Sequence, residues 1–322
     1  MAATAQITDS DLLPSGLSIA ELDFADAKDD PAGFGHALVD SLRDTGFAVI
    51  RNHTIPAETI DAMEAQSRAF FALPDDTKRC YAMPNAHYQR GYSPFRTESA
   101  KDRDTPDLKE FWHEGRATIP GIPGTPEVAE LPDFNAVSTA LFDAMDAFGR
   151  TLMVHVGQTL EMTEADMRAA LVNGNSILRL LHYPPVEDVD SIEPGSVRAA
   201  AHEDINLLTL LLGAEEAGLE VQHRSGTWLP ANPPPGAVVV NAGDMLARLT
   251  GGEIPSTTHR VVNPSPDRCA HSRYSMPFFL HPANDFVLEA LPSCVARGAV
   301  AEEPITANGF LNERLREIGL KV

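Results

Sequence analysis

Two histidines and one aspartate are the residues of this chain best suited to chemistry. His202 and Asp204 stand two positions apart at the head of a predicted strand, and His259 lies near the start of another. Because side chains alternate along a strand, residues two apart share one face. Two imidazoles and one carboxylate can hold iron(II) on one side and leave positions open for oxygen and a substrate. We therefore predict that these three residues are the metal ligands and the catalytic centre.

The His-x-Asp spacing is weak evidence when it stands alone. The chain contains 11 histidines, so roughly one such pattern is expected by chance at ordinary aspartate frequency. An isolated copy would be interpreted as a surface histidine at a strand end and an acid that caps a turn. Residues elsewhere in the chain must therefore decide between the two interpretations.

A second pair with the same spacing indicates an anion site. Arg273 and Ser275 share a predicted strand face, and the apolar residues that follow, 276–280, indicate that the strand is buried. A buried arginine needs an anionic partner, and a guanidinium pairs with a carboxylate through two hydrogen bonds. This pair would seat the distal carboxylate of 2-oxoglutarate. The hydroxyl of Tyr183 could reach the same cosubstrate, or its ring could be a core aromatic with a wet edge.

The elements that would position these residues change in character near residue 175. The first part predicts a strand at 47–50, a helix opening at Pro56, a polar loop over 81–105 and a helix over 136–160. The second part predicts short strands separated by turn residues, at 176–183, 206–212, 219–223, 237–241, 257–262 and 273–280. Helices are predicted at 244–249 and near 312–320. This pattern favours a fold that is mainly β with α: a helix-rich N-terminal region, 1–174, on a jelly-roll (double-stranded β-helix) core with a C-terminal helix, 175–322. The two parts would form one integrated structural unit.

Composition narrows the classes of partner. The 322 residues include 25 Lys and Arg against 46 Asp and Glu, a net charge of −21, and no basic cluster is present. This balance disfavours nucleic acid and anionic membranes as partners. No apolar run approaches the roughly 18 residues of a membrane span, and the start of the chain lacks the pattern of a signal peptide. Three scattered cysteines fit a reducing compartment. We expect a cytoplasmic protein that acts on a small molecule.

Several short stretches spread along the chain resemble the isopenicillin N synthase-like family of iron(II)/2-oxoglutarate oxygenases. The resemblance runs from about residue 17 to 320 and rests on segments in the family's order: 46–53, 70–74, 91–92, 109–111, 183–185, 202–204, 241–245, 256–261 and 273–275. It implies that His202, Asp204 and His259 bind iron and that Arg273 and Ser275 bind 2-oxoglutarate with help from Tyr183.

The same resemblance has consequences for further positions. In the family, the region that contains Arg90, Tyr92 and Arg96 overhangs the barrel mouth, so these residues are candidate substrate contacts, with solvated loop residues as the alternative interpretation. Leu181 stands where plant members often carry an asparagine, which removes one polar contact. The segment between His259 and Arg273 is longer than is common, which predicts an insertion around 264–268.

The resemblance implies a 2-oxoglutarate-dependent dioxygenase that uses iron(II) and O2. Such an enzyme releases succinate and carbon dioxide and oxidises a C–H bond, most commonly by hydroxylation. One alternative is an oxidase like isopenicillin N synthase, which needs no 2-oxoglutarate and uses the same Arg-x-Ser pair for its substrate's carboxylate. Another is a non-catalytic sensor on the same barrel, which the intact triad disfavours.

Overall fold

The computed structural model describes residues 18–97, 106–116, 119, 121–185, 198–212, 218–263 and 271–317. The helices are α1 (Asp26–Asp29), α2 (Pro31–Thr45), α3 (Ala57–Phe71), α4 (Asp75–Arg79), the 3-10 turn η2 (Pro84–Ala86), α5 (Phe134–Thr159), α6 (Glu164–Leu171), α7 (Asp244–Leu249), α8 (Pro292–Ala296) and α9 (Ala307–Glu317). The strands are β1 (Glu21–Asp23), β2 (Phe47–Arg51), β3 (Gly91–Ser93), β4 (Glu110–Gly115), β5 (Ile177–Tyr183), β6 (Ala199–His202), β7 (Leu208–Leu212), β8 (Leu219–Gln222), β9 (Trp228–Pro230), β10 (Val238–Ala242), β11 (His259–Val261), β12 (Arg273–Leu280), β13 (Val287–Leu288) and β14 (Ile305–Thr306).

Two sheets facing each other form the core of the fold, as the predicted jelly roll requires. The larger sheet has the order β1-β2-β10-β7-β12-β5-β4-β3, and the smaller has the order β6-β11-β8-β9. Side chains of both sheets pack together: Phe47 and Val239 of the larger sheet lie in one apolar cluster with Val221 and Val261 of the smaller sheet. The space between the two sheets is therefore filled with apolar side chains at this end.

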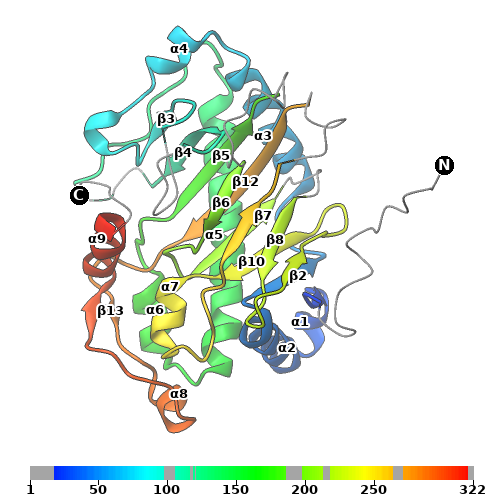
Figure 1. The fold of residues 1–322 in the computed structure, drawn as a ribbon, viewed down its shortest axis with the longest axis vertical. Coiled ribbons are helices and arrows are strands. Elements are labelled where there is room, and N and C mark those ends of the chain that lie inside the picture. The colour runs from blue at the N-terminus through cyan, green and yellow to red at the C-terminus, as the bar shows by residue number, and fades with distance from the viewer. Residues whose placement is uncertain are drawn as a thin grey trace, which may run out of the picture.

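Helices cover the other face of the larger sheet. The helix α5 contacts β4, β7 and β12, and α2 and α3 pack against α5; Figure 1 shows α5 running behind the strands. Apolar residues recur every three or four positions along α5, and the buried ones include Leu141, Phe148 and Val156. This confirms the predicted helix at 136–160, and it places the main apolar core between helices and sheet.

Several predicted elements are confirmed to within a few residues, and some strands were missed. The predicted strands 176–183, 219–223, 237–241 and 273–280 correspond to β5, β8, β10 and β12, and α7 has the predicted bounds. The strands β3, β4 and β6 are among those that were not predicted. In β4, the acids that mask the strand pattern are buried and paired: Glu110 bonds Lys78 (2.8 Å) and His182 (2.7 Å), and Glu114 bonds Ser138 (2.7 Å).

The two halves of the chain share the larger sheet, because β1 to β4 come from the first half and this group hydrogen-bonds with strands of the second. The division at residue 174 stays a prediction. The C-terminal helix begins at Ala307, earlier than expected, and the predicted insertion at 264–268 lies outside the described residues. Within the described ranges, no helix combines the length and the apolar character needed to cross a membrane.

Candidate metal centre

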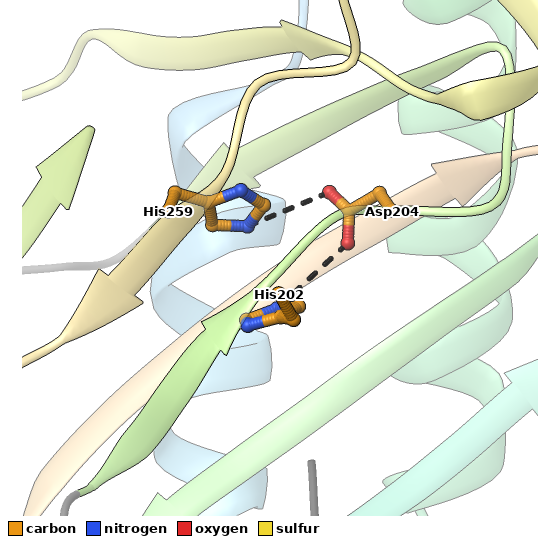
Figure 2. A group of neighbouring side chains, drawn as sticks. All are labelled: His202, Asp204 and His259. Carbon is orange, nitrogen blue, oxygen red and sulfur yellow. Dashed lines mark ion pairs between the residues drawn. The ribbon is translucent and has the colours of Figure 1, made fainter. Parts of the chain in front are cut away.

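Three ligand atoms converge between the two sheets. His202 ends β6 and His259 begins β11, and the two are direct partners in the antiparallel ladder, with ring centroids 4.4 Å apart. The carboxylate of Asp204 lies 4.0 Å from Nε2 of His202 and 3.7 Å from Nε2 of His259. One donor atom from each residue lies within 4.8 Å of the others, and Figure 2 shows all three side chains pointing toward one another. A single metal ion can contact all three at this spacing.

The prediction that His202 and Asp204 occupy one strand is wrong. The strand β6 ends at His202, and Asp204 lies in the loop that leads to β7. The backbone of that loop is tied to α7, because the carbonyl of Asp204 accepts a hydrogen bond from the N–H of Asp244 at 2.8 Å, at the start of the helix. The side chain of Asp204 is therefore presented by a loop between the two sheets and not by the strand that carries His202.

Hydrogen bonds to the backbone set the tautomers of both histidines. Nδ1 of His202 lies 2.7 Å from the carbonyl oxygen of Ala200, and Nδ1 of His259 lies 3.1 Å from that of Thr257. A carbonyl can only accept, so each Nδ1 carries the proton and each Nε2 keeps its lone pair for a ligand. Burial, and then the neighbouring His259, lower the pKa of His202 to about 4. The imidazole of His202 is therefore neutral and able to bind a metal near pH 7.

Two strands of the larger sheet orient the carboxylate of Asp204. Its Oδ2 accepts hydrogen bonds from Oγ1 of Thr209 (2.6 Å) on β7 and Nδ2 of Asn241 (2.8 Å) on β10, which are direct cross-strand partners. Burial acts to raise the pKa of Asp204, but the two histidines and these hydrogen bonds outweigh it, so the pKa lies below its usual 3.8. Together, two imidazoles and one carboxylate make the donor set of a facial triad.

Because Gly243 has no side chain, the loop that contains Asp204 can pack closely against it. A Cβ added to Gly243 would lie 2.3 Å from Oδ1 of Asn206 and 2.8 Å from the carbonyl oxygen of Asp204. We predict that Gly243→Ala lowers the free energy of unfolding by about 1–3 kcal/mol through overpacking and weakens metal binding by displacing Asp204. Urea unfolding and a metal titration would measure both effects. Gly124→Ala is the control, since nothing lies within 4 Å of its added Cβ; equal stabilities of the two variants would contradict the prediction.

A buried cation lies on the larger sheet, on the face that looks toward the triad. Arg273 begins β12 opposite Tyr183, the last residue of β5. Its guanidinium carbon lies 5.1 Å from the centre of the Tyr183 ring, and one of its nitrogens lies 3.4 Å from the hydroxyl of Ser275. All three residues are buried. The structure thus brings together the three residues predicted to bind a carboxylate, and the strand they define is buried as expected.

Comparisons with known proteins agree with this geometry. Residues 174–282 match the 2OG-Fe(II) oxygenase superfamily, and residues 17–150 match the N-terminal region of non-haem dioxygenases in morphine synthesis. A 2-oxoglutarate-dependent dioxygenase of Aspergillus rugulosus is 31% identical, with 89% of this chain and 94% of the relative covered. This chain belongs to the 2OG-Fe(II) oxygenase superfamily.

Solved structures carry the likeness over the whole oxygenase fold. A protein of Caulobacter crescentus assigned to the 2OG-Fe(II) oxygenase family is 44% identical with a TM-score of 0.84, covering 94% of this chain and 99% of that one. A full-length Neurospora crassa protein solved in complex with α-ketoglutarate is 31% identical with a TM-score of 0.85, covering 95% and 98%. The oxygenase is accordingly a 2-oxoglutarate-dependent dioxygenase with a jelly-roll core, and its cofactors are iron(II), 2-oxoglutarate and O2. The oxidase that works without 2-oxoglutarate is not favoured.

The three residues suggested as substrate contacts in the oxygenase have different surroundings. Arg90 is fully buried, donates a hydrogen bond to Oδ1 of Asn175 at 2.8 Å and packs over Gly115; this burial lowers its pKa to about 10. Tyr92 does not reach the triad face, because its ring packs in the helix-covered core and its hydroxyl bonds a buried glutamate. Arg96 is exposed. Of these three residues, only Arg90 is buried beside the face of the larger sheet that carries Arg273 and Ser275.

Sequence reasoning missed several side chains around the centre. Thr209 and Asn241 were assigned no role, and their types carry no signal until the sheet register is known. Arg179 and His281 were also assigned no role, although a signal existed: Arg179 lies four positions before Tyr183 on one predicted strand, and His281 lies eight positions after Arg273, just beyond the end of another. Period-two alternation could have found both.

His281 makes the stability of the oxygenase depend on pH. Burial lowers its pKa from 6.5 to about 4, so the unfolded chain binds more protons than the folded one between these values. Stability is therefore expected to fall as the pH decreases from 6.5 to 4. In His281→Gln this part of the fall should disappear, as measured by urea unfolding at several pH values. The control is His36→Gln, at an exposed position; identical pH profiles for the two variants would refute the assignment.

Proposed function

We propose that His202, Asp204 and His259 bind iron(II), and that Arg273, Ser275 and Tyr183 bind the distal carboxylate of 2-oxoglutarate. The reaction is hydroxylation of a C–H bond in a small molecule, with 2-oxoglutarate and O2 converted to succinate and carbon dioxide. The observation that carries this proposal is the set of three donor atoms within 4.8 Å, in which both histidines have Nδ1 committed to backbone carbonyls.

The residues around the centre hold its parts in a fixed arrangement. Thr209 and Asn241 both bond Oδ2 of Asp204, so Oδ1, which lies 4.0 Å from Nε2 of His202, is available as the metal donor. Arg273 provides a forked cation for the cosubstrate, and Ser275 adds a hydroxyl. When bound, iron(II) supplies the activation of oxygen and the oxidation of the C–H bond. Burial of Arg273 and Ser275 at 2% exposure keeps water from competing for the carboxylate.

Small molecules are the substrates to test. The Neurospora crassa protein has also been solved in complex with α-ketoglutarate and thymine, and that structure is 30% identical with a TM-score of 0.84. Thymine is therefore a reasonable first probe for this chain. The expected absence of nucleic-acid and membrane partners and the cytoplasmic location stay proposals that rest on the charge balance and the scattered cysteines.

An anaerobic titration tests the function. Protein loaded with iron(II) is titrated with 2-oxoglutarate while the visible charge-transfer band of the iron chelate is recorded. The band is expected to appear with the unmodified protein and to weaken sharply in Arg273→Ala. If iron binds and no band forms, the proposal is wrong, and oxygen uptake without any keto acid would then support the oxidase. Tight 2-oxoglutarate binding without turnover on a broad substrate panel would instead support a sensor.

A further inference from the structure

Three side chains on the triad side of the larger sheet are only partly buried although they lie on or next to its central strands. Arg179 lies on β5, four residues before Tyr183, and Phe279 and His281 follow Arg273 at even spacing along and just beyond β12. Phe279 is the cross-strand partner of Thr209, whose hydroxyl bonds Asp204. Phe279 therefore lies beside the proposed iron site, and each of the three residues keeps part of its surface exposed.

Arg179 is held in one orientation. Its Nε donates a hydrogen bond to Nε2 of His113 at 2.7 Å, and Nδ1 of His113 donates in turn to the carbonyl oxygen of Tyr88 at 2.8 Å. The guanidinium carbon lies 4.2 Å from the ring centre of Phe111 and 5.3 Å from that of Phe279. Stacking fixes the plane of the guanidinium, and the imidazole fixes its rotation. The result is a rigid hydrogen-bond donor on the triad side of the sheet.

His281, in contrast to Arg179, can accept a hydrogen bond. Its Nδ1 lies 3.2 Å from the carbonyl oxygen of Phe279, so Nδ1 carries the proton and Nε2 is an acceptor. Burial lowers its pKa to about 4, and the charges of Asp204 and Arg90 act on that pKa in opposite directions. The imidazole is therefore neutral near pH 7 and lies within electrostatic reach of the iron ligand.

Phe279 lies next to both residues: the guanidinium carbon of Arg179 is 5.3 Å from its ring centre, and His281 follows it along the chain. Phe279 and His281 are two positions apart, which corresponds to about 7 Å along an extended strand. A flat molecule lying against Phe279 could reach Arg179 with one edge and His281 with another, with its C–H groups near the iron site.

We propose that Arg179 and His281 are the substrate-recognition pair of this oxygenase, and that they select a small planar ring carrying both a carbonyl oxygen and an N–H group. The carbonyl accepts a hydrogen bond from Arg179, and the N–H donates to Nε2 of His281. Cyclic amides and imides have this pattern. The inference rests on the proposed function and adds the substrate class to it.

Equilibrium binding to anaerobic protein loaded with iron(II) and 2-oxoglutarate tests the pair. The probes are thymine and 2-pyridone, which have both groups, and 1,3-dimethylthymine, which lacks the N–H donors. The variants are Arg179→Met and His281→Leu. Arg68→Met is the matched control, because Arg68 also stacks on an aromatic ring, with its guanidinium carbon 4.5 Å from the centre of the Tyr274 ring, but lies on an exposed helix position. The affinity for 2-oxoglutarate is measured in the same preparations.

Each variant is expected to weaken thymine binding by about tenfold or more, as loss of a hydrogen bond to a charged or buried partner would. The affinity for 2-oxoglutarate should stay unchanged. The unmodified protein and Arg68→Met should prefer thymine over its dimethyl form, and His281→Leu should lose this preference. A merely structural role for His281 would leave the preference intact.

Three results would contradict the assignment of Arg179 and His281 as substrate-recognition residues. They are failure of both thymine and 2-pyridone to bind the unmodified protein, unchanged thymine affinity in Arg179→Met, or a preference for thymine that persists in His281→Leu. If 2-oxoglutarate binding remains normal in these cases, only the substrate inference falls. Loss of 2-oxoglutarate binding in the unmodified protein would overturn the proposed function and the substrate inference with it.

Discussion

Replacing Asp204 by asparagine is expected to abolish iron-dependent turnover. The side chains of Thr209 and Asn241 both donate to Oδ2 of Asp204, so the amide oxygen of the new asparagine would take that position. Its NH2 group would then face the metal position, where it has no lone pair to offer. Loss of groups that merely orient a metal ligand costs about 10–100-fold in affinity, and loss of the ligand itself should cost more.

Glu203→Gln is the matched control for this substitution. Glu203 is the neighbouring acid, but its side chain is exposed and bonds the hydroxyl of Thr258. Iron(II) should raise the melting temperature of the unmodified protein and of the control, because a ligand that binds only the folded state stabilises it. It should leave Asp204→Asn unchanged. An Asp204→Asn protein that keeps its iron affinity would exclude Asp204 as a ligand.

Replacing Arg273 by methionine is expected to remove 2-oxoglutarate binding while iron binding persists. Arg273 is buried at 2% exposure, and truncation of one partner in a buried charge pair costs about 2–5 kcal/mol. This corresponds to an increase in Kd on the order of 30-fold or more. Arg273→Lys keeps the charge but loses the planar fork, so an intermediate Kd is expected. The anaerobic titration that follows the visible band would measure the Kd for 2-oxoglutarate of the unmodified protein and of both variants.

A second arginine provides the control for the Arg273 experiment. Arg260 also lies on a strand and stacks on an aromatic ring, with its guanidinium carbon 4.0 Å from the ring centre of Trp228, and it is paired with Glu220 at 2.7 Å. It follows His259 directly in β11 and so points to the opposite face. Arg260→Met should bind 2-oxoglutarate normally. Equal losses in both variants would mean that the effect comes from general destabilisation of the barrel.

The sequence predicted the three side chains that the structure brings together as candidate metal ligands, although one reason given for their proximity was wrong. The His202-x-Asp204 spacing, the Arg273-x-Ser275 pair, the pattern of short strands between 176 and 280 and the family resemblance together predicted a facial triad on a jelly roll. The mechanism that unites His202 and Asp204 was different, because β6 ends at His202 and a loop presents Asp204. Strand ends depend on backbone partners far along the chain, and local alternation carries no information about them.

Only the tertiary structure decided which other side chains surround the centre. Tyr92 looked like a loop residue near the barrel mouth, yet it lies in the helix-covered core because β3 pairs with β4. Thr209 and Asn241 act together on Asp204 because β7 and β10 pair in one particular register. The sequence determined the residue types and the alternation within each strand, which are local properties. Cross-strand register joins residues distant in the chain, and it is set by the packing of the whole sheet.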